Sequence, residues 1–202
     1  MILLLPHRPP ATLALIGVST ALYVAVFPLG LHSLTAPLLI SEYTRPLLPE
    51  IRDGQLWRLV TPVFLHFGIF HIVFNMLWTW ELGRLIESRH GALGLLGLTA
   101  LIGVASNLCQ YAVDGPWFGG MSGVIYGYFG YLWMQGVFNP AFGMRLRRPV
   151  VYLLLGWLAL CWSGIFEALF DLRVANTAHT IGLISGIVLA FALIGVGRWG
   201  RA

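Results

Sequence analysis

Long uncharged segments recur along this chain. Residues 11–29 and 92–113 contain no charged side chain, and each approaches or exceeds the roughly 20 apolar residues that a helix needs to cross a bilayer core. Only 10% of the residues are charged, which is well below the share in soluble domains. The sequence predicts an all-α polytopic membrane protein, one domain over residues 1–202, with six transmembrane helices. These are expected at about 11–29, 68–87, 92–113, 122–137, 150–170 and 179–196.

The connection between the first two predicted spans is unusually long. Residues 30–67 mix acids and arginines with apolar pairs and four prolines, so they are too polar to span and too apolar for a plain linker. A segment of this kind favours an amphipathic position in the membrane interface. Trp57-Arg58 is typical of an anchor at the level of the lipid headgroups, where tryptophan is enriched. A connection of this length also points to a function.

The charge distribution predicts how the protein is oriented. The net charge of +4 comes from arginines and no lysine. Since arginine marks cytoplasmic loops, we expect membrane topology rather than nucleic-acid binding to explain it. Both termini are then cytoplasmic, and spans 122–137 and 179–196 begin at the outer face. Eight arginines lie on the predicted cytoplasmic side (Arg8, Arg84, Arg89, Arg145, Arg147, Arg148, Arg198, Arg201) and four on the other (Arg45, Arg52, Arg58, Arg173).

The N-terminus and the cysteines add two expectations. Met1 to Pro10 contains His7, Arg8 and three prolines, without the pattern of a cleavable signal peptide, so the first span is expected to remain as an anchor. Cys109 and Cys161 both fall inside apolar segments. We expect them to be small buried side chains rather than a disulfide or metal ligands.

The segment around Ser122 points to a cavity within the membrane. Asp114-Gly115-Pro116 predicts a turn, and the following span, 122–137, is about 24 Å long at 1.5 Å per residue. A bilayer core is about 30 Å thick, so this helix is expected to begin below the surface, with the preceding loop dipping in. Irregular backbone at that depth is tolerated only where protein buries it or it lines a watery cavity.

Glycines predict that two spans touch each other. Gly123, Gly127 and Gly130 share one face of span 122–137, while His179, Gly182 and Gly186 share one face of span 179–196. Small residues permit close helix packing, and packing alone could explain them. The same contact would also bring Ser122 beside His179. A neighbouring imidazole is the usual base that activates a serine hydroxyl. No carboxylate lies near His179 on its own span, so we expect a Ser–His dyad.

His71 and Asn75 lie four residues apart and therefore project from one face of the second span. On the predicted topology this face opens toward the same cavity as Ser122. Side-chain and backbone N–H groups at such a place can stabilise an oxyanion. The alternative is an interhelical hydrogen bond that only holds the bundle together. Tyr126 follows Ser122 by one helical turn, where either stacking under His179 or ordinary packing is possible.

Four motifs follow one another along the chain: Trp57-Arg58, His71-x-x-x-Asn75, Gly120-Met121-Ser122-Gly123 and Ala178-His179-x-x-Gly182-x-x-x-Gly186. With six predicted spans, this order resembles the rhomboid family of intramembrane serine proteases. Pro116-Trp117-Phe118-Gly119 is similar to the bacterial members with a six-span core. The resemblance covers about residues 52–189.

The resemblance implies a role for each motif. Ser122 would be the nucleophile, His179 the general base, and His71, Asn75 and the backbone N–H of Ser122 the oxyanion site. It implies that Tyr126 supports His179, that residues 30–67 form a membrane-embedded first loop held by Trp57 and Arg58, and that Gly120 and Gly123 support the serine. It implies no metal or nucleotide cofactor, and transmembrane segments of other proteins as substrates. The expected location is the bacterial inner membrane, with an unspecified oligomeric state.

Two other function classes compete with a protease. A catalytically inactive rhomboid-like binder or chaperone would hold client helices without cutting them, although an intact Ser122 and His179 argue against it. A metal-dependent membrane enzyme could use His66, His71 and His179, but the sequence lacks a His-Glu-x-x-His helix. A transporter is disfavoured because no inverted repeat with paired broken helices is visible.

Overall fold

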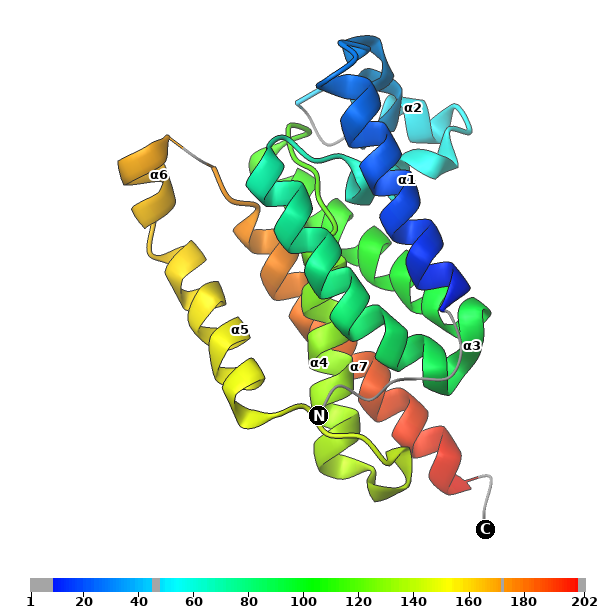
Figure 1. Cartoon of the computed structure of the whole chain (residues 1–202). Coiled ribbons are helices and arrows are strands. Elements are labelled where there is room, and N and C mark those ends of the chain that lie inside the picture. Colours follow the sequence, from blue (N-terminus) through cyan, green and yellow to red (C-terminus); the bar gives the residue numbers. More distant parts are fainter. Residues whose placement is uncertain (1–8, 45–47, 172, 200–202) are drawn as a thin grey trace.

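The structure is a computed structural model that describes residues 9–44, 48–171 and 173–199, the last four of them by backbone only. Every regular element in these ranges is helical, so the predicted all-α class is confirmed. Figure 1 shows α4 (Ser122–Phe138) inside a bundle of helices, with α5 (Arg148–Trp162) standing at one side. The expectation about a signal peptide at Met1 to Pro10 falls largely outside the described residues, as do Arg8, Arg45, Arg201 and the side chain of Arg198.

α1 (Pro10–Val26) matches the first predicted span but ends three residues earlier. Its first turn is capped from a distant helix by Glu87. The carboxylate of Glu87 accepts the N–H groups of Ala11 and Thr12 at 2.8 Å each and the Thr12 hydroxyl at 2.7 Å. The first N–H groups of a helix have no partner within it, and a negative charge suits that end. Glu87 therefore fixes α1 to the bundle.

The long connection is compact and consists of short helices: η1 (His32–Leu34), η2 (Ala36–Leu38), α2 (Pro49–Arg52), η3 (Leu56–Leu59) and η4 (Thr61–Phe64). Arg58 is buried and holds this segment together. Its guanidinium donates to the carbonyls of Ala36 and Leu39 at 2.8 and 3.0 Å and pairs with Glu42 at 3.1 Å. The indole of Trp57, half exposed, donates to the carbonyl of Pro37 at 3.2 Å.

A second buried charge, Glu50, supports the same connection. Its carboxylate accepts the N–H of Glu42 at 2.8 Å and the hydroxyl of Ser41 at 2.9 Å. Burial by itself would raise the pKa of Glu50. The backbone N–H groups of residues 42 and 50, the Ser41 hydroxyl and the charge of Arg58 together hold this pKa below its usual value. Glu50 is thus kept charged inside the connection.

α3 (Ile69–Asp114) contains the second and third predicted spans, which are separated at Gly91. This residue has φ +68°, a conformation that glycine adopts without steric cost, so the chain reverses there. The predicted boundary between 87 and 92 is therefore confirmed as a break between two helical parts, 69–90 and 92–114. α4 (Ser122–Phe138) begins and ends within one residue of its predicted span.

The predicted fifth span, 150–170, is wrong as one continuous helix. The structure has α5 (Arg148–Trp162) and a separate short helix, α6 (Ile165–Phe170). Gly164 between them has φ +76°, and the Ser163 hydroxyl accepts the N–H of Ile165, the first residue of α6, at 3.3 Å. Left-handed backbone at a glycine ends a helix, which explains the break. The sixth predicted span is α7 (Asn176–Trp199), which begins three residues early.

Two helices in the described part of the chain are long and apolar enough to cross a membrane by length and composition: α3 and residues 176–195 of α7. α1 and α5 are apolar but shorter. α1 runs toward the end of the bundle that carries α2, and α7 runs in the opposite direction (Figure 1). The number of spans remains a prediction.

Candidate active site

α4 and α7 meet backbone to backbone, as the glycine pattern predicted. A Cβ atom on Gly182 would overlap the carbonyl oxygen of Gly123, and one on Gly186 would overlap that of Gly127. Gly130 faces the carbonyl of Leu183 in the same way. Small-residue faces of this kind allow helices to approach closely. The contact sets the register in which the first turns of the two helices face each other.

Ser122 and His179 come together at that end. Nε2 of His179 lies 2.8 Å from Oγ of Ser122, although the residues are 57 positions apart in sequence. His179 is 5% exposed. Among the described residues its Nδ1 has no hydrogen-bond partner, and therefore no carboxylate. The geometry lets an unprotonated Nε2 accept the serine proton.

Tyr126 lies one turn beyond Ser122, and its ring packs against the imidazole of His179. The two ring centroids are 5.0 Å apart with a 35° tilt. The hydroxyl of Tyr126 donates to the carbonyl of Leu154 in α5 at 3.0 Å. Tyr126 thus contacts His179 with its ring and α5 with its hydroxyl.

The loop before Ser122 is held by groups on both sides. Gly120 has φ +119°, and its N–H donates to the carbonyl of Pro62 at 3.0 Å. Met121, the next residue, is fully buried, and its N–H points at Nε2 of His66 at 3.5 Å. Gly120 therefore lies between the connection before α3 and the start of α4, two residues ahead of the serine.

His71 lies against this loop. A Cβ on Gly120 would come within 2.5 Å of Nε2 of His71, so only glycine at this position leaves room for the His71 ring. Nδ1 of His71 faces the N–H of Phe67 at 3.5 Å. A ring nitrogen that accepts a hydrogen bond carries no proton. In a neutral imidazole the proton then lies on the other nitrogen, which for His71 is Nε2. That N–H faces the loop two residues before Ser122.

Asn75 is tied to His71 rather than directly to the serine. Its amide nitrogen donates to the backbone carbonyl of His71 at 2.8 Å, while its Oδ1 is buried without a partner among the described residues. Gly123 packs against the hydroxyl of Ser106 and the carbonyl of Ala178. Trp57 and Arg58 lie in the connection described above and hold it in place.

Two residues near the site were given no role in the protease that the sequence predicted. Gln110 accepts the N–H of Ala178, the neighbour of His179, at 2.9 Å, and its amide donates to Asp114 at 2.6 Å. It positions the first turn of α7. An amide side chain within the uncharged segment 92–113 was the available signal, because polar groups are costly inside a bilayer.

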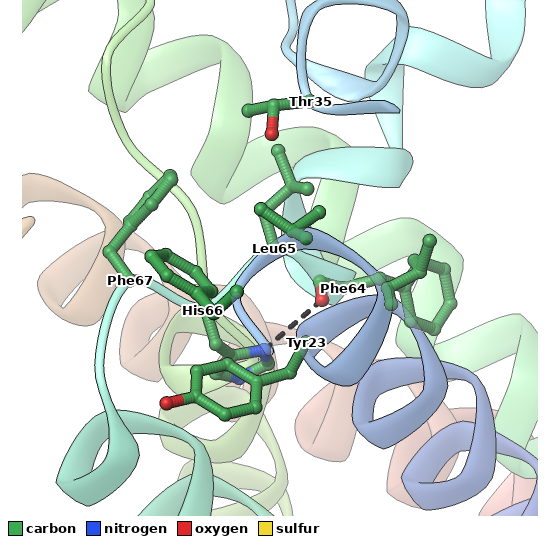
Figure 2. Close-up of a pocket in the computed structure, with 9 residues that line it drawn as sticks. Tyr23, Thr35, Phe64, Leu65, His66 and Phe67 are labelled. Carbon is green, nitrogen blue, oxygen red and sulfur yellow. Dashed lines mark hydrogen bonds between the residues drawn. The ribbon is translucent and has the colours of Figure 1, made fainter. Parts of the chain in front are cut away.

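His66 is the second such residue. It is 2% exposed, and its Nδ1 bonds the carbonyl of Phe64 at 3.1 Å, as Figure 2 shows. Burial lowers the pKa of His66 to about 3, with a further contribution from the His71 ring, whose centroid lies 4.9 Å away. A neutral His66 can donate from Nδ1 to Phe64 and accept the Met121 N–H at Nε2. The shallow pocket in Figure 2 contains neither Ser122 nor His179; it is lined by Leu22, Tyr23, Val26, Phe27, Thr35, Phe64, Leu65, His66 and Phe67.

The described residues contain no group of three histidines, cysteines or acids that could hold a metal ion. His66 and His71 are adjacent, but each has a backbone partner that occupies a ring nitrogen. The expectation of a metal-free site remains a prediction.

The family model described as the rhomboid domain matches residues 53–196. The chain belongs to the rhomboid family. The resemblance seen in the four sequence motifs is thereby confirmed, and with it membership of a family embedded in membranes.

Curated relatives of this rhomboid chain carry the name rhomboid protease GlpG. The protein from Klebsiella pneumoniae (strain 342) is 39% identical over 137 residues, and that from Salmonella newport (strain SL254) is 40% identical over 137 residues. Each alignment covers 68% of this chain and 48% of the relative. The chain thus spans about half the length of the curated relatives it matches.

Proposed function

We propose that this protein is an intramembrane serine endopeptidase that cleaves transmembrane segments of other membrane proteins. The observation that carries the proposal is the 2.8 Å approach of His179 Nε2 to Ser122 Oγ at the buried start of α4. Family membership and the protease names of the relatives support the same activity. The inactive binder or chaperone is disfavoured because a protein that only holds client helices does not need a serine aligned with an imidazole.

In the proposed reaction, Ser122 Oγ attacks the carbonyl carbon of the scissile peptide bond while Nε2 of His179 takes the hydroxyl proton. The tetrahedral oxyanion is stabilised by the N–H of Ser122 and by Nε2–H of His71, with Asn75 either donating directly or fixing His71. Collapse breaks the C–N bond, and His179 gives its proton to the leaving amine. Water then hydrolyses the acyl-enzyme with His179 as base, which restores Ser122.

The same proposal includes the membrane arrangement. All six apolar segments cross the bilayer of a bacterial inner membrane, with both termini in the cytoplasm and Ser122 opening toward the outer face. The 30–67 connection lies in the outer interface, where the half-exposed Trp57 suits the headgroup region. A substrate helix approaches laterally between the first part of α3 and α5, and it unwinds locally before attack. The mechanism requires no cofactor.

A fluorophosphonate probe tests the proposal in detergent-solubilised protein, because it reacts with an activated serine. Wild type should be labelled, while Ser122→Ala and His179→Ala should not be. Ser88→Ala removes an exposed hydroxyl on α3 and should label like wild type. Cleavage of a model transmembrane substrate should fall by about 10⁶ when Ser122 or His179 is lost. Folded wild-type protein that is neither labelled nor active would contradict the protease and favour the inactive binder.

A further inference from the structure

Four arginines gather at the end of the bundle opposite to Ser122. Arg89 precedes the turn within α3, whereas Arg145, Arg147 and Arg148 follow η5 (Pro140–Phe142) and lead into α5. We call these four residues the arginine cluster. Nη2 of Arg89 would lie 2.9 Å from a Cβ on Gly143, so the two segments meet although they are far apart in sequence.

Two guanidinium groups of the cluster are held in position. Arg89 lies over the ring of Phe142, with 5.8 Å from Cζ to the ring centroid. Nε of Arg145 donates to the carbonyl of Gly136 at 2.7 Å. Four residues after Gly136 comes Pro140, which has no N–H to give that carbonyl its usual helical partner. Arg145 fills the gap and keeps both Nη groups for another acceptor.

No carboxylate neutralises the cluster within the described residues. The ion pairs there join Arg58 to Glu42, Arg84 to Glu81 and Arg173 to Glu167. Glu87, near Arg89 in sequence, is occupied by the first turn of α1. Guanidinium groups that are oriented but unpaired suit the oxygens of a phosphate, which they bind through two parallel N–H bonds.

Exposed apolar side chains adjoin the cluster on two sides. Phe138 at the end of α4 is 49% exposed and pairs with Phe191 of α7, with ring centroids 5.3 Å apart. On α5, within five residues of Arg148, Tyr152 is 67% and Leu153 56% exposed. In a bilayer acyl chains cover these apolar faces, so a phospholipid joins both features: its headgroup reaches the cluster while its own chains lie on the adjoining surface.

We propose that the arginine cluster binds the phosphate of an anionic phospholipid, whose acyl chains lie along the exposed faces of α4, α7 and α5. The site lies about 25 Å from Ser122, the length of the 17-residue α4 at 1.5 Å per residue. It is separate from the proposed peptidase site and does not depend on it.

Lipid retention measured by native mass spectrometry tests this proposal. The protein is purified in a neutral detergent and mixed with equal amounts of phosphatidylglycerol and phosphatidylcholine. Wild type should retain phosphatidylglycerol in preference. Each arginine near a membrane surface contributes about fivefold in affinity, so Arg89→Gln/Arg145→Gln should lose about 25-fold. Gly143→Ala keeps every charge but displaces Arg89, and it should also weaken retention.

Matched controls separate the site from general charge. Arg52→Gln and Arg173→Gln remove exposed arginines outside the cluster and should retain the lipid like wild type. If the first double variant fails to fold, Arg147→Gln/Arg148→Gln carries the test, because both residues are exposed. The proposal would be overturned if wild type retained the two lipids equally, or if the folded double variant retained phosphatidylglycerol as well as wild type. It would also be overturned if the controls lost as much lipid as the cluster variants, or if millimolar inorganic phosphate displaced the lipid. Fluorophosphonate labelling in the same samples reports on the peptidase site separately.

Discussion

Gly182 packs so closely against the carbonyl oxygen of Gly123 that no side chain would fit at position 182. The contact places His179, one turn before Gly182, beside Ser122, the residue before Gly123. The distance between the serine and the histidine therefore depends on the absence of a methyl group one turn deeper in the bundle.

Replacing Gly182 with alanine should separate the two helices. The new methyl group meets backbone, which cannot rotate away, so we expect a loss of about 3 kcal/mol or more in stability, with loss of probe labelling. The matched control is Gly195→Ala on the same helix, where nothing lies within 4 Å of the added Cβ. Thermal unfolding in detergent and labelling yield measure both effects. An active Gly182→Ala enzyme would show that α4 and α7 can separate without moving His179.

Gly120→Ala should damage the oxyanion site. The added Cβ would sit 2.5 Å from Nε2 of His71 and displace that ring, so turnover should fall by about 10²–10³. Gly54→Ala imposes a comparable left-handed strain, at φ +92°, with nothing within 4 Å. It should lose stability and keep its activity. Similar activity in the two variants would argue that His71 does not contribute to the oxyanion site.

Two substitutions of Tyr126 separate the effect of its ring, which packs against His179, from the effect of its hydroxyl, which donates to the Leu154 carbonyl. Tyr126→Phe keeps the ring under His179 and loses the bond to the Leu154 carbonyl, so it should lower stability by about 1 kcal/mol and keep most labelling. Tyr126→Leu removes both interactions and should reduce labelling strongly. Labelling rates at saturating probe distinguish the two. Equal rates in the two variants would mean that the ring does not position the imidazole.

His66 should make the fold sensitive to acid. Its pKa is about 3 when folded and about 6.5 when unfolded, so its stabilising contribution is complete above pH 6.5 and is lost as the pH falls toward 3. The slope is at most about 1.4 kcal/mol per pH unit. In His66→Gln, which cannot titrate, the difference in stability from wild type should shrink over this range. Melting temperatures at pH 7, 6, 5 and 4 provide the measurement, and a constant difference would contradict it.

Much of this arrangement was predictable because it depends on local patterns. Predominantly apolar segments located the long helices to within a few residues, except that 150–170 divides at Gly164. Glycines at helical spacing predicted which faces of α4 and α7 touch, and this placed Ser122 beside His179. Such patterns work where one residue type has one dominant physical use, as glycine does in close helix packing.

The remainder depends on contacts between distant residues. Gln110 meets the N–H of Ala178 across 68 positions, and nothing in the sequence of either segment indicates the pair. His66 precedes the second predicted span, where a histidine at the membrane interface is the ordinary expectation, yet it is buried under the loop before the serine. The break at Gly164 also escaped prediction, because a single glycine in an apolar run is usually tolerated within a helix.

The cap that Glu87 places on α1 has a consequence for synthesis. α1 is synthesised before Glu87, because the carboxylate that completes its N-terminus lies about 75 residues later in the chain. Until residue 87 arrives, the early N–H groups of α1 must bond to water or to headgroups at the membrane surface. α1 is thus fixed only after residue 87 has been made, which couples the final position of α1 to the folding of the helix that follows it.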